Sequence, residues 1–267
     1  MSTPIAAGTL RPPRTHTHQV TTAAAGPVEV TVQDRDRTRP FLLLHGGGGL
    51  PTMTGFADLL AERTHSRVLL PTHPGFGATP KAAGLTGVTE LAGAYVTLLD
   101  RLDLTDVTVI GNSFGGWLAA EIALQASPRV SGAVIIDGIG IEVGGHPMTD
   151  VSGLAPAEIQ RYSFHDPGKA PPAPPGGTGP SPDVRALIGY TGPTMSDPAL
   201  TERLGGIGIP VHVLWGESDG IVDPEYGRAY AAAIPSSTFT LLPRTGHLPQ
   251  VETPEELLGA LLDLGDR

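Results

Sequence analysis

The most informative stretch of the sequence reads Gly111-Asn112-Ser113-Phe114-Gly115-Gly116. The apolar run 107–110 precedes it, and a helix-like stretch follows it. Gly-x-Ser-x-Gly between a strand and a helix is the pattern of a nucleophile elbow, a strained turn that exposes a serine above the edge of a sheet. Glycines on either side of the serine relieve crowding at such a turn. The stretch therefore predicts an α/β fold and a nucleophilic Ser113.

A serine hydroxyl attacks efficiently only when a neighbouring base accepts its proton. His247 lies just after an expected strand at 238–242, in a loop that would bring it to the carboxyl edge of the sheet. The imidazole needs an acid that fixes its tautomer and stabilises its charged form. Asp219 follows an expected strand at 211–215, and the chain order Ser, Asp, His is the one expected for this fold. We predict Ser113, Asp219 and His247 as catalytic residues.

Three other carboxylates are open as the acid. Glu217 and Asp223 lie close to Asp219 in the sequence. Asp137 ends the preceding strand, from which a carboxylate can also reach the histidine.

Attack by a serine creates an oxyanion, which needs preorganised N–H donors. One predicted donor is the amide of Phe114, directly after the nucleophile. The other is expected from the loop His45-Gly46-Gly47-Gly48-Gly49, most simply the amide of Gly47. A phosphate-binding glycine loop is the alternative, but this loop lacks the endings and spacings of the P-loop and dinucleotide motifs.

Strands alternate with helices along most of the chain, which predicts a mostly parallel, twisted sheet of about eight strands with helices on both faces. The first 15 residues are expected to be disordered, and the first two strands to pair antiparallel at a sheet edge. The third strand is a continuous apolar run, and the fourth is expected to end at Pro71. Strands are expected at 16–21, 28–33, 41–44, 68–70, 107–110, 130–136, 211–215 and 238–242, and helices at 54–64, 89–102, 114–126, 224–233 and 254–262.

Residues 139–206 interrupt this rhythm and are interpreted as a cap or lid inserted into a core of residues 1–138 and 207–267. The segment holds weak helical patterns near 155–164 and 183–190. Between them, the tract 167–182 is mainly proline, glycine and alanine, a composition that favours a mobile, protease-sensitive loop. A featureless long connection is the alternative interpretation.

Composition excludes several classes of protein. The net charge is −10, and the only lysines are Lys81 and Lys169, which argues against nucleic-acid partners and anionic membrane surfaces. The absence of cysteine excludes disulfides, thiolate catalysis and cysteine-ligated metal. No apolar run approaches the length of a membrane span and no signal peptide is recognised, so we expect a cytoplasmic protein.

Together these motifs resemble the α/β-hydrolase superfamily, over about residues 28–263. Leu44-His45-Gly46, Pro74-Gly75-Phe76-Gly77 and Gly246-His247 followed by Glu252-Thr253-Pro254 are similar to further family motifs. Thr72 stands where the family often has an aspartate. The Asn-Ser-Phe elbow and the Pro-Gly-Phe-Gly turn fit best the branch of capped serine esterases and carbon–carbon hydrolases.

The predicted activity is hydrolysis of a carboxylic ester or lactone of small to medium size and apolar character, through an acyl-enzyme. Carbon–carbon bond hydrolysis and amidase or aminopeptidase activity are the alternatives, followed by a non-hydrolytic ligand-binding or lyase role. We expect a small-molecule substrate, no cofactor and no metal, and the oligomeric state stays open. The predicted substrate-binding residues are Gly46, Trp117, Ile139, Tyr162, Phe164 and Leu248.

Overall fold

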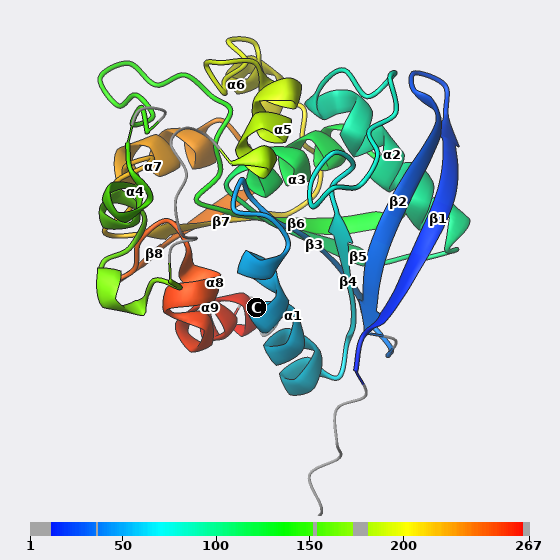
Figure 1. Ribbon diagram of the computed structural model, residues 1–267, viewed down its shortest axis with the longest axis horizontal. Coiled ribbons are helices and arrows are strands. Elements are labelled where there is room, and N and C mark those ends of the chain that lie inside the picture. Colours follow the sequence, from blue (N-terminus) through cyan, green and yellow to red (C-terminus); the bar gives the residue numbers. More distant parts are fainter. Residues whose placement is uncertain (1–11, 36, 152–153, 173–180, 264–267) are drawn as a thin grey trace, which may run out of the picture.

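An eight-stranded sheet forms the centre of the protein (Figure 1). The computed structural model describes residues 12–35, 37–151, 154–172 and 181–263. The strand order is β1-β2-β4-β3-β5-β6-β7-β8; β2 pairs antiparallel with β1 and β4, and the other neighbours are parallel. The predicted α/β class is confirmed. The strands are β1 (Arg14–Thr22), β2 (Gly26–Arg35), β3 (Pro40–Leu44), β4 (Arg67–Thr72), β5 (Val107–Asn112), β6 (Val130–Ile136), β7 (Val211–Gly216) and β8 (Ser237–Leu242).

Helices cover both faces of the sheet (Figure 1). One face carries α1 (Pro51–Thr64), α8 (Pro249–Glu252) and α9 (Pro254–Leu262). The other carries α2 (Val88–Arg101), α3 (Phe114–Leu124) and α7 (Pro224–Ala232). The sequence of β3 is continuously apolar because both faces of this strand are buried. Leu42 and Leu44 pack into the core cluster on one face, and Leu43 packs into the cluster on the other.

The chain between β6 and β7 leaves the sheet and forms short helices. They are α4 (Pro156–Ser163), the 3₁₀ turn η1 (Pro167–Lys169), α5 (Pro182–Thr191) and α6 (Leu200–Leu204). α4 and α5 correspond to the two predicted helical patterns. α6 was not predicted; its Arg203 forms an ion pair with buried Glu121 of α3 at 2.7 Å, which attaches this end of the segment to the core.

Within the proline-rich tract, residues 173–180 lie outside the described part of the chain. Its protease sensitivity stays a prediction.

Two expectations about the N-terminal half were wrong in part. Residues 1–11 lie outside the described chain, but Arg14 and Thr15, expected to be disordered, belong to β1 because β2 is long enough to pair with them. Pro71 does not end β4; it pairs with Val32 of β2. The last β3–β4 pair is Leu42 with Leu69, so the missing N–H of Pro71 lies beyond the reach of β3 and costs the sheet little.

Candidate active site

Ser113 has the backbone geometry of a strained elbow. It lies between β5 and α3 with φ 56° and ψ −116°, a conformation that a non-glycine residue adopts only when its surroundings enforce it. Two glycines make the turn possible. A Cβ on Gly111 would lie 1.8 Å from the carbonyl oxygen of Gly115, and a Cβ on Gly115 would lie 2.1 Å from that of Leu44. Any side chain there would push strand and helix apart, so the spacing of the motif is a packing requirement.

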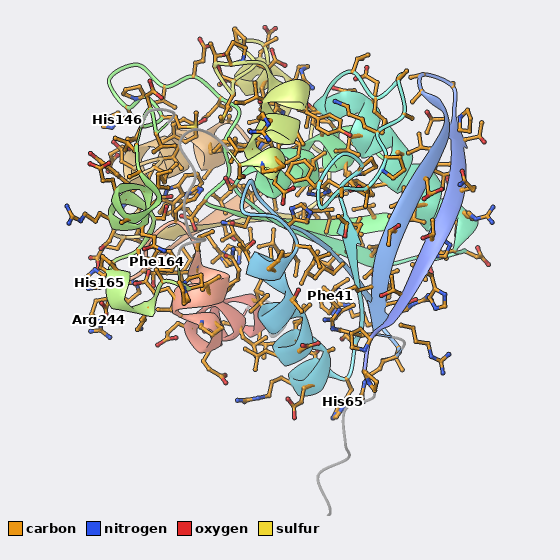
Figure 2. All side chains as sticks on the ribbon, viewed as in Figure 1. Phe41, His65, His146, Phe164, His165 and Arg244 are labelled. Carbon is orange, nitrogen blue, oxygen red and sulfur yellow. The ribbon has the colours of Figure 1, made fainter. Side chains whose placement is uncertain are left out.

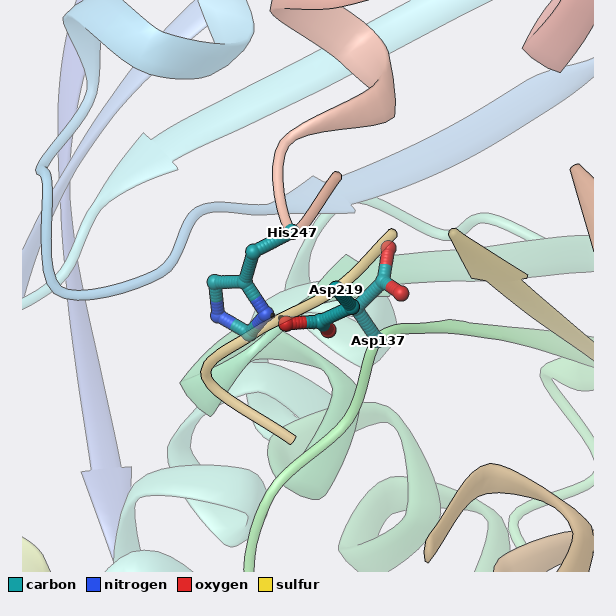
Figure 3. Close-up of side chains that lie close together, drawn as sticks. All are labelled: Asp137, Asp219 and His247. Carbon is teal, nitrogen blue, oxygen red and sulfur yellow. Dashed lines mark hydrogen bonds and ion pairs between the residues drawn. The ribbon is translucent and has the colours of Figure 1, made fainter. Parts of the chain in front are cut away.

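A buried acid–base pair is formed by residues from two other loops at the same edge of the sheet. Nδ1 of His247, after β8, lies 2.7 Å from Oδ2 of Asp219, after β7. The other carboxylate oxygen, Oδ1, accepts hydrogen bonds from the amides of Ile221 at 2.8 Å and Val222 at 3.1 Å. A carboxylate only accepts, so the imidazole proton is on Nδ1 and Nε2 is free to accept a proton. Figure 3 shows this pair together with Asp137.

The loop that carries His247 is tied directly to the elbow. The side-chain amide of Asn112, the residue before Ser113, donates to the carbonyl oxygen of His247 at 2.9 Å and to that of Ile136 at 3.2 Å. Gln250 donates in turn to Oδ1 of Asn112 at 3.0 Å. Sequence reasoning missed this bridge, because the second position of the elbow motif carries no pattern that reveals a partner 135 residues away.

The glycine loop after β3 lies against the elbow, as an oxyanion site requires. A Cβ on Gly46 would be 3.0 Å from Cβ of Ser113. Phe114 begins α3, so its amide has no acceptor within the helix. Among the described residues, neither this amide nor that of Gly47 has a hydrogen-bond partner. Leu187 of α5 reaches over Gly47, with Cδ1 at 3.1 Å from the position of a Cβ there.

Two buried histidines, His45 of this loop and His73 after β4, are hydrogen-bonded to each other. Nε2 of His73 lies 2.9 Å from the carbonyl oxygen of His45, and Nδ1 of His73 hydrogen-bonds the hydroxyl of Tyr95. The His73 amide also donates to Nε2 of His45 at 3.3 Å, so His45 is the acceptor at that nitrogen. Burial lowers the pKa of His45 to about 4 and that of His73 well below 6.5, which keeps both rings neutral.

These two histidines predict that acid lowers the free energy of unfolding. The unfolded chain takes up protons below pH 6.5 that the folded chain refuses, so the stability is fully present above that pH and is lost as the pH falls towards 4. The shift of His45 alone corresponds to roughly 3 kcal/mol. Urea unfolding at about pH 7.5 and about pH 5 measures the effect. His73→Gln should flatten the dependence, whereas His16→Gln, on the exposed strand β1, should keep it; an unchanged slope in His73→Gln would contradict this assignment.

The other predicted substrate-binding residues occupy different environments. Ile139 donates its amide to the carbonyl oxygen of Ser113 at 3.3 Å, and Leu248 follows the base and is half-buried. Phe164 is buried, whereas Tyr162 is 41% exposed. Trp117 is packed inside the core, with its ring against Gly140 and its indole N–H bonded to Glu121 at 3.1 Å. A binding role for any of them stays a prediction.

The segment 162–169, which we call the cap arm, is hydrogen-bonded to the loops that carry Asp219 and His247. The carbonyl oxygen of Tyr162 accepts from the amide of Gly220 at 2.9 Å, and that of Ser163 accepts from the amide of His247 at 2.8 Å. His165, labelled in Figure 2, bonds through Nδ1 to the hydroxyl of Ser218 at 2.8 Å. These bonds tie residues 162–165 to the loops that carry Asp219 and His247, a contact that sequence reasoning missed.

Glu252 joins the cap arm to the base loop. Its buried carboxylate accepts from the amides of Gly246 at 2.7 Å, His165 at 3.1 Å and Asp166 at 2.7 Å. The sequence contained Glu252 only as part of a C-terminal motif, without a role. A carboxylate has two oxygens that can accept all three of these bonds, whereas a glutamine amide has only one accepting oxygen.

Glu252→Gln should lower kcat by about 10-fold, with a smaller change in KM, because one of the three amides would face an NH₂ group and the loop carrying His247 would loosen. Steady-state kinetics measure this. The matched control is Glu255→Gln, since Glu255 is exposed and, among the described residues, forms an ion pair with Arg63 at the surface. If the two variants behaved alike, Glu252 would have no special part in holding the base loop.

Asp137, Asp219 and His247 also bring ligand atoms within 4.8 Å of one another, close enough for a metal ion. The hydrogen bond between Asp219 and His247 occupies one such atom of each residue. Metal-independent turnover stays a prediction. No helix in the described residues is long and apolar enough to cross a membrane.

Comparison with known proteins matches most of the chain to one family. The family model described as "Alpha/beta hydrolase family" matches residues 41–260, which include the glycine loop, the elbow and both residues of the acid–base pair. The chain belongs to the alpha/beta hydrolase family. This alpha/beta hydrolase is similar in structure to an esterase from Thermogutta terrifontis, with a TM-score of 0.70 and 23% identity over 93% of this chain and 97% of that one. At that identity the likeness shows the fold alone.

Two relatives are similar in sequence to this alpha/beta hydrolase. A 2-hydroxy-6-oxo-2,4-heptadienoate hydrolase from Pseudomonas putida is 32% identical over 120 residues, which are 44% of each protein, so the match spans less than half of that relative. A 2-hydroxy-6-oxononadienedioate/2-hydroxy-6-oxononatrienedioate hydrolase from Cupriavidus pinatubonensis is 24% identical over 251 residues, covering 79% of this chain and 81% of that protein.

Proposed function

We propose that this alpha/beta hydrolase is a cofactor-free serine hydrolase that cleaves a carboxylic ester or lactone of modest size and apolar character. The observation that carries the proposal is the combination of Ser113 in a strained elbow with a buried Asp219–His247 pair whose loop is bonded to that elbow. This combination has the parts that serine nucleophilic catalysis requires.

The reaction follows from the roles of these residues. Ser113 Oγ attacks the carbonyl carbon while Nε2 of His247 takes its proton, and Asp219 stabilises the imidazolium that forms. The amides of Gly47 and Phe114 hold the oxyanion. His247 then protonates the leaving alcohol, which leaves an acyl-enzyme on Ser113. Water that gives its proton to His247 attacks the acyl group, and the acid departs as Ser113 regains its proton.

Carbon–carbon hydrolysis of a vinylogous diketone is the second candidate, because the two relatives above are named as dienoate hydrolases. The same residues would serve it: water adds to a carbonyl next to the bond that breaks and gives a proton to His247, which returns it to the carbon that leaves. Amide hydrolysis is supported only by the fact that the same three side chains could also catalyse it.

A substrate panel separates these candidates. It contains p-nitrophenyl esters of increasing acyl length, lactones and a dienone diketone, assayed with and without EDTA, together with labelling by a fluorophosphonate. We expect ester or lactone turnover that EDTA does not change, and a labelled Ser113. Preferential turnover of the diketone would favour the second candidate. A protein that neither labels nor turns over would contradict both.

A further inference from the structure

Asp137 is a buried carboxyl group beside the acid–base pair, and the reaction above gives it no role. It directly follows β6 in a left-handed backbone conformation, with φ 47°. Its side chain is fully buried; Oδ1 accepts from the amide of Gly216 at 2.8 Å, and Oδ2 accepts no hydrogen bond from the described residues. One carboxyl oxygen lies within 4.8 Å of a ligand atom of both Asp219 and His247, and Figure 3 shows the three side chains gathered from three separate loops.

Two carboxyl groups this close together and buried do not both ionise, because neither charge is solvated and they repel each other. Asp219 is the better site for the charge, since two amides and the imidazole stabilise it, whereas Asp137 has a single amide. Burial, and then the negative charge of Asp219, raise the pKa of Asp137 well above its ordinary value. The proton of the pair therefore resides on Asp137.

We propose that Asp137 is a positioning residue in the form of a neutral carboxylic acid, whose O–H group donates to the carboxylate of Asp219 and holds it in place for His247. The unpartnered Oδ2 is the atom that carries this proton, because Oδ1 is already an acceptor. This inference rests on the proposed serine hydrolase function. It also gives the two rival acids of the sequence different tasks: Asp219 holds the charge, and Asp137 supplies a neutral donor.

The pH profile of kcat/KM distinguishes a neutral from an ionised Asp137. The titratable groups that bond the imidazole or the loops beside it include Asp219, Glu252, His165 and Glu217. Asp137→Asn replaces the protonated oxygen with an amide donor and removes no charge, so the acid limb should stay at the pH of the wild type. An ionised Asp137 would give the opposite result: its loss would deprive the imidazolium of a neighbouring charge and move the limb to lower pH. Asp223→Asn, at the N-terminus of α7, is the charge-removal control.

Rescue by the conservative variant tests the donor role. Asp137→Gly permits the left-handed backbone but removes the whole carboxyl group, and should lower kcat/KM by roughly 10- to 100-fold, mainly through kcat, as for a lost hydrogen bond to a charged group. Asp137→Asn should recover most of that loss. Equal losses in the two variants, both shown to be folded by urea unfolding, would overturn the proposal.

Infrared spectroscopy gives a readout that needs no substrate. The chain has 27 Asp and Glu residues, and at neutral pH exposed carboxyl groups are ionised, so the carbonyl band of a protonated carboxyl group reports a buried one. The band should be present in the wild type and in Asp223→Asn and absent from Asp137→Asn. A wild type without it overturns the inference even if it hydrolyses esters. A protein that shows the band but neither labels nor turns over would overturn the proposed function, and the positioning role with it, while leaving Asp137 protonated.

Discussion

Ser113→Ala is expected to lower kcat by on the order of 10³-fold or more and to abolish fluorophosphonate labelling, because no other atom can form the acyl-enzyme. The fold should survive. The turn is held by the glycine contacts around it and not by the serine hydroxyl, and alanine keeps the Cβ that packs beside Gly46. Turnover of the best substrate in the panel, labelling by mass spectrometry and urea unfolding together measure the outcome.

The control is a second buried serine. Ser66 is 3% exposed and lies before β4, away from the catalytic loops, so Ser66→Ala should keep both turnover and labelling. Labelling that persists in Ser113→Ala, or disappears in Ser66→Ala, would place the nucleophile elsewhere.

His247→Ala should cost about as much as the loss of the nucleophile, again on the order of 10³-fold or more in kcat, because the hydroxyl of Ser113 is not activated without a base. The double variant should be little worse than either single one, since nucleophile and base act as a unit. Steady-state kinetics of the wild type, the two single variants and the double variant form a double-mutant cycle that tests this. If the losses of transition-state stabilisation, expressed as free energies, added in the double variant, the two residues would act independently, against the proposed mechanism.

His165→Ala is the matched control for a histidine near the site. This residue bonds Ser218 from the cap arm, and its backbone amide, which the substitution keeps, is the group that contacts Glu252. We expect a loss far smaller than that of His247→Ala. If His165→Ala lost as much activity as His247→Ala, the kinetics would not distinguish the catalytic base from a residue that only supports the loop of the base.

Local patterns were enough to predict the candidate nucleophile, acid and base. Gly111 and Gly115 show why. There is no room for a Cβ at either position, so this turn requires glycine at both, and their spacing can be recognised in the sequence. Strands and helices are recognised by the period at which apolar residues recur in the sequence. β3 is continuously apolar because Leu43 packs into the core cluster on the opposite face from Leu42 and Leu44. The order of Ser113, Asp219 and His247 then follows from the order of the loops.

Contacts between distant segments were not predictable in this way. Glu252 binds amides of the cap arm 86 and 87 residues earlier in the chain, and backbone amides are present at every residue but proline, so no side-chain pattern identifies the partners. The same limit applied to Asn112, whose partner His247 contributes only a carbonyl oxygen. Sequence reasoning therefore missed that the backbone of the cap arm bonds the loops that carry Asp219 and His247.

The sequence by itself determined the sheet, the elbow and which residues stand at the ends of β5, β7 and β8, because steric limits and hydrophobic periodicity act over a few neighbouring residues. Only the tertiary structure decided how those ends are held and which carboxyl group keeps its proton. Asp137 and Asp219 look alike in the sequence as residues that follow strands. Their difference comes from burial and from the number of donors around each, and both depend on segments that meet only when the chain is folded.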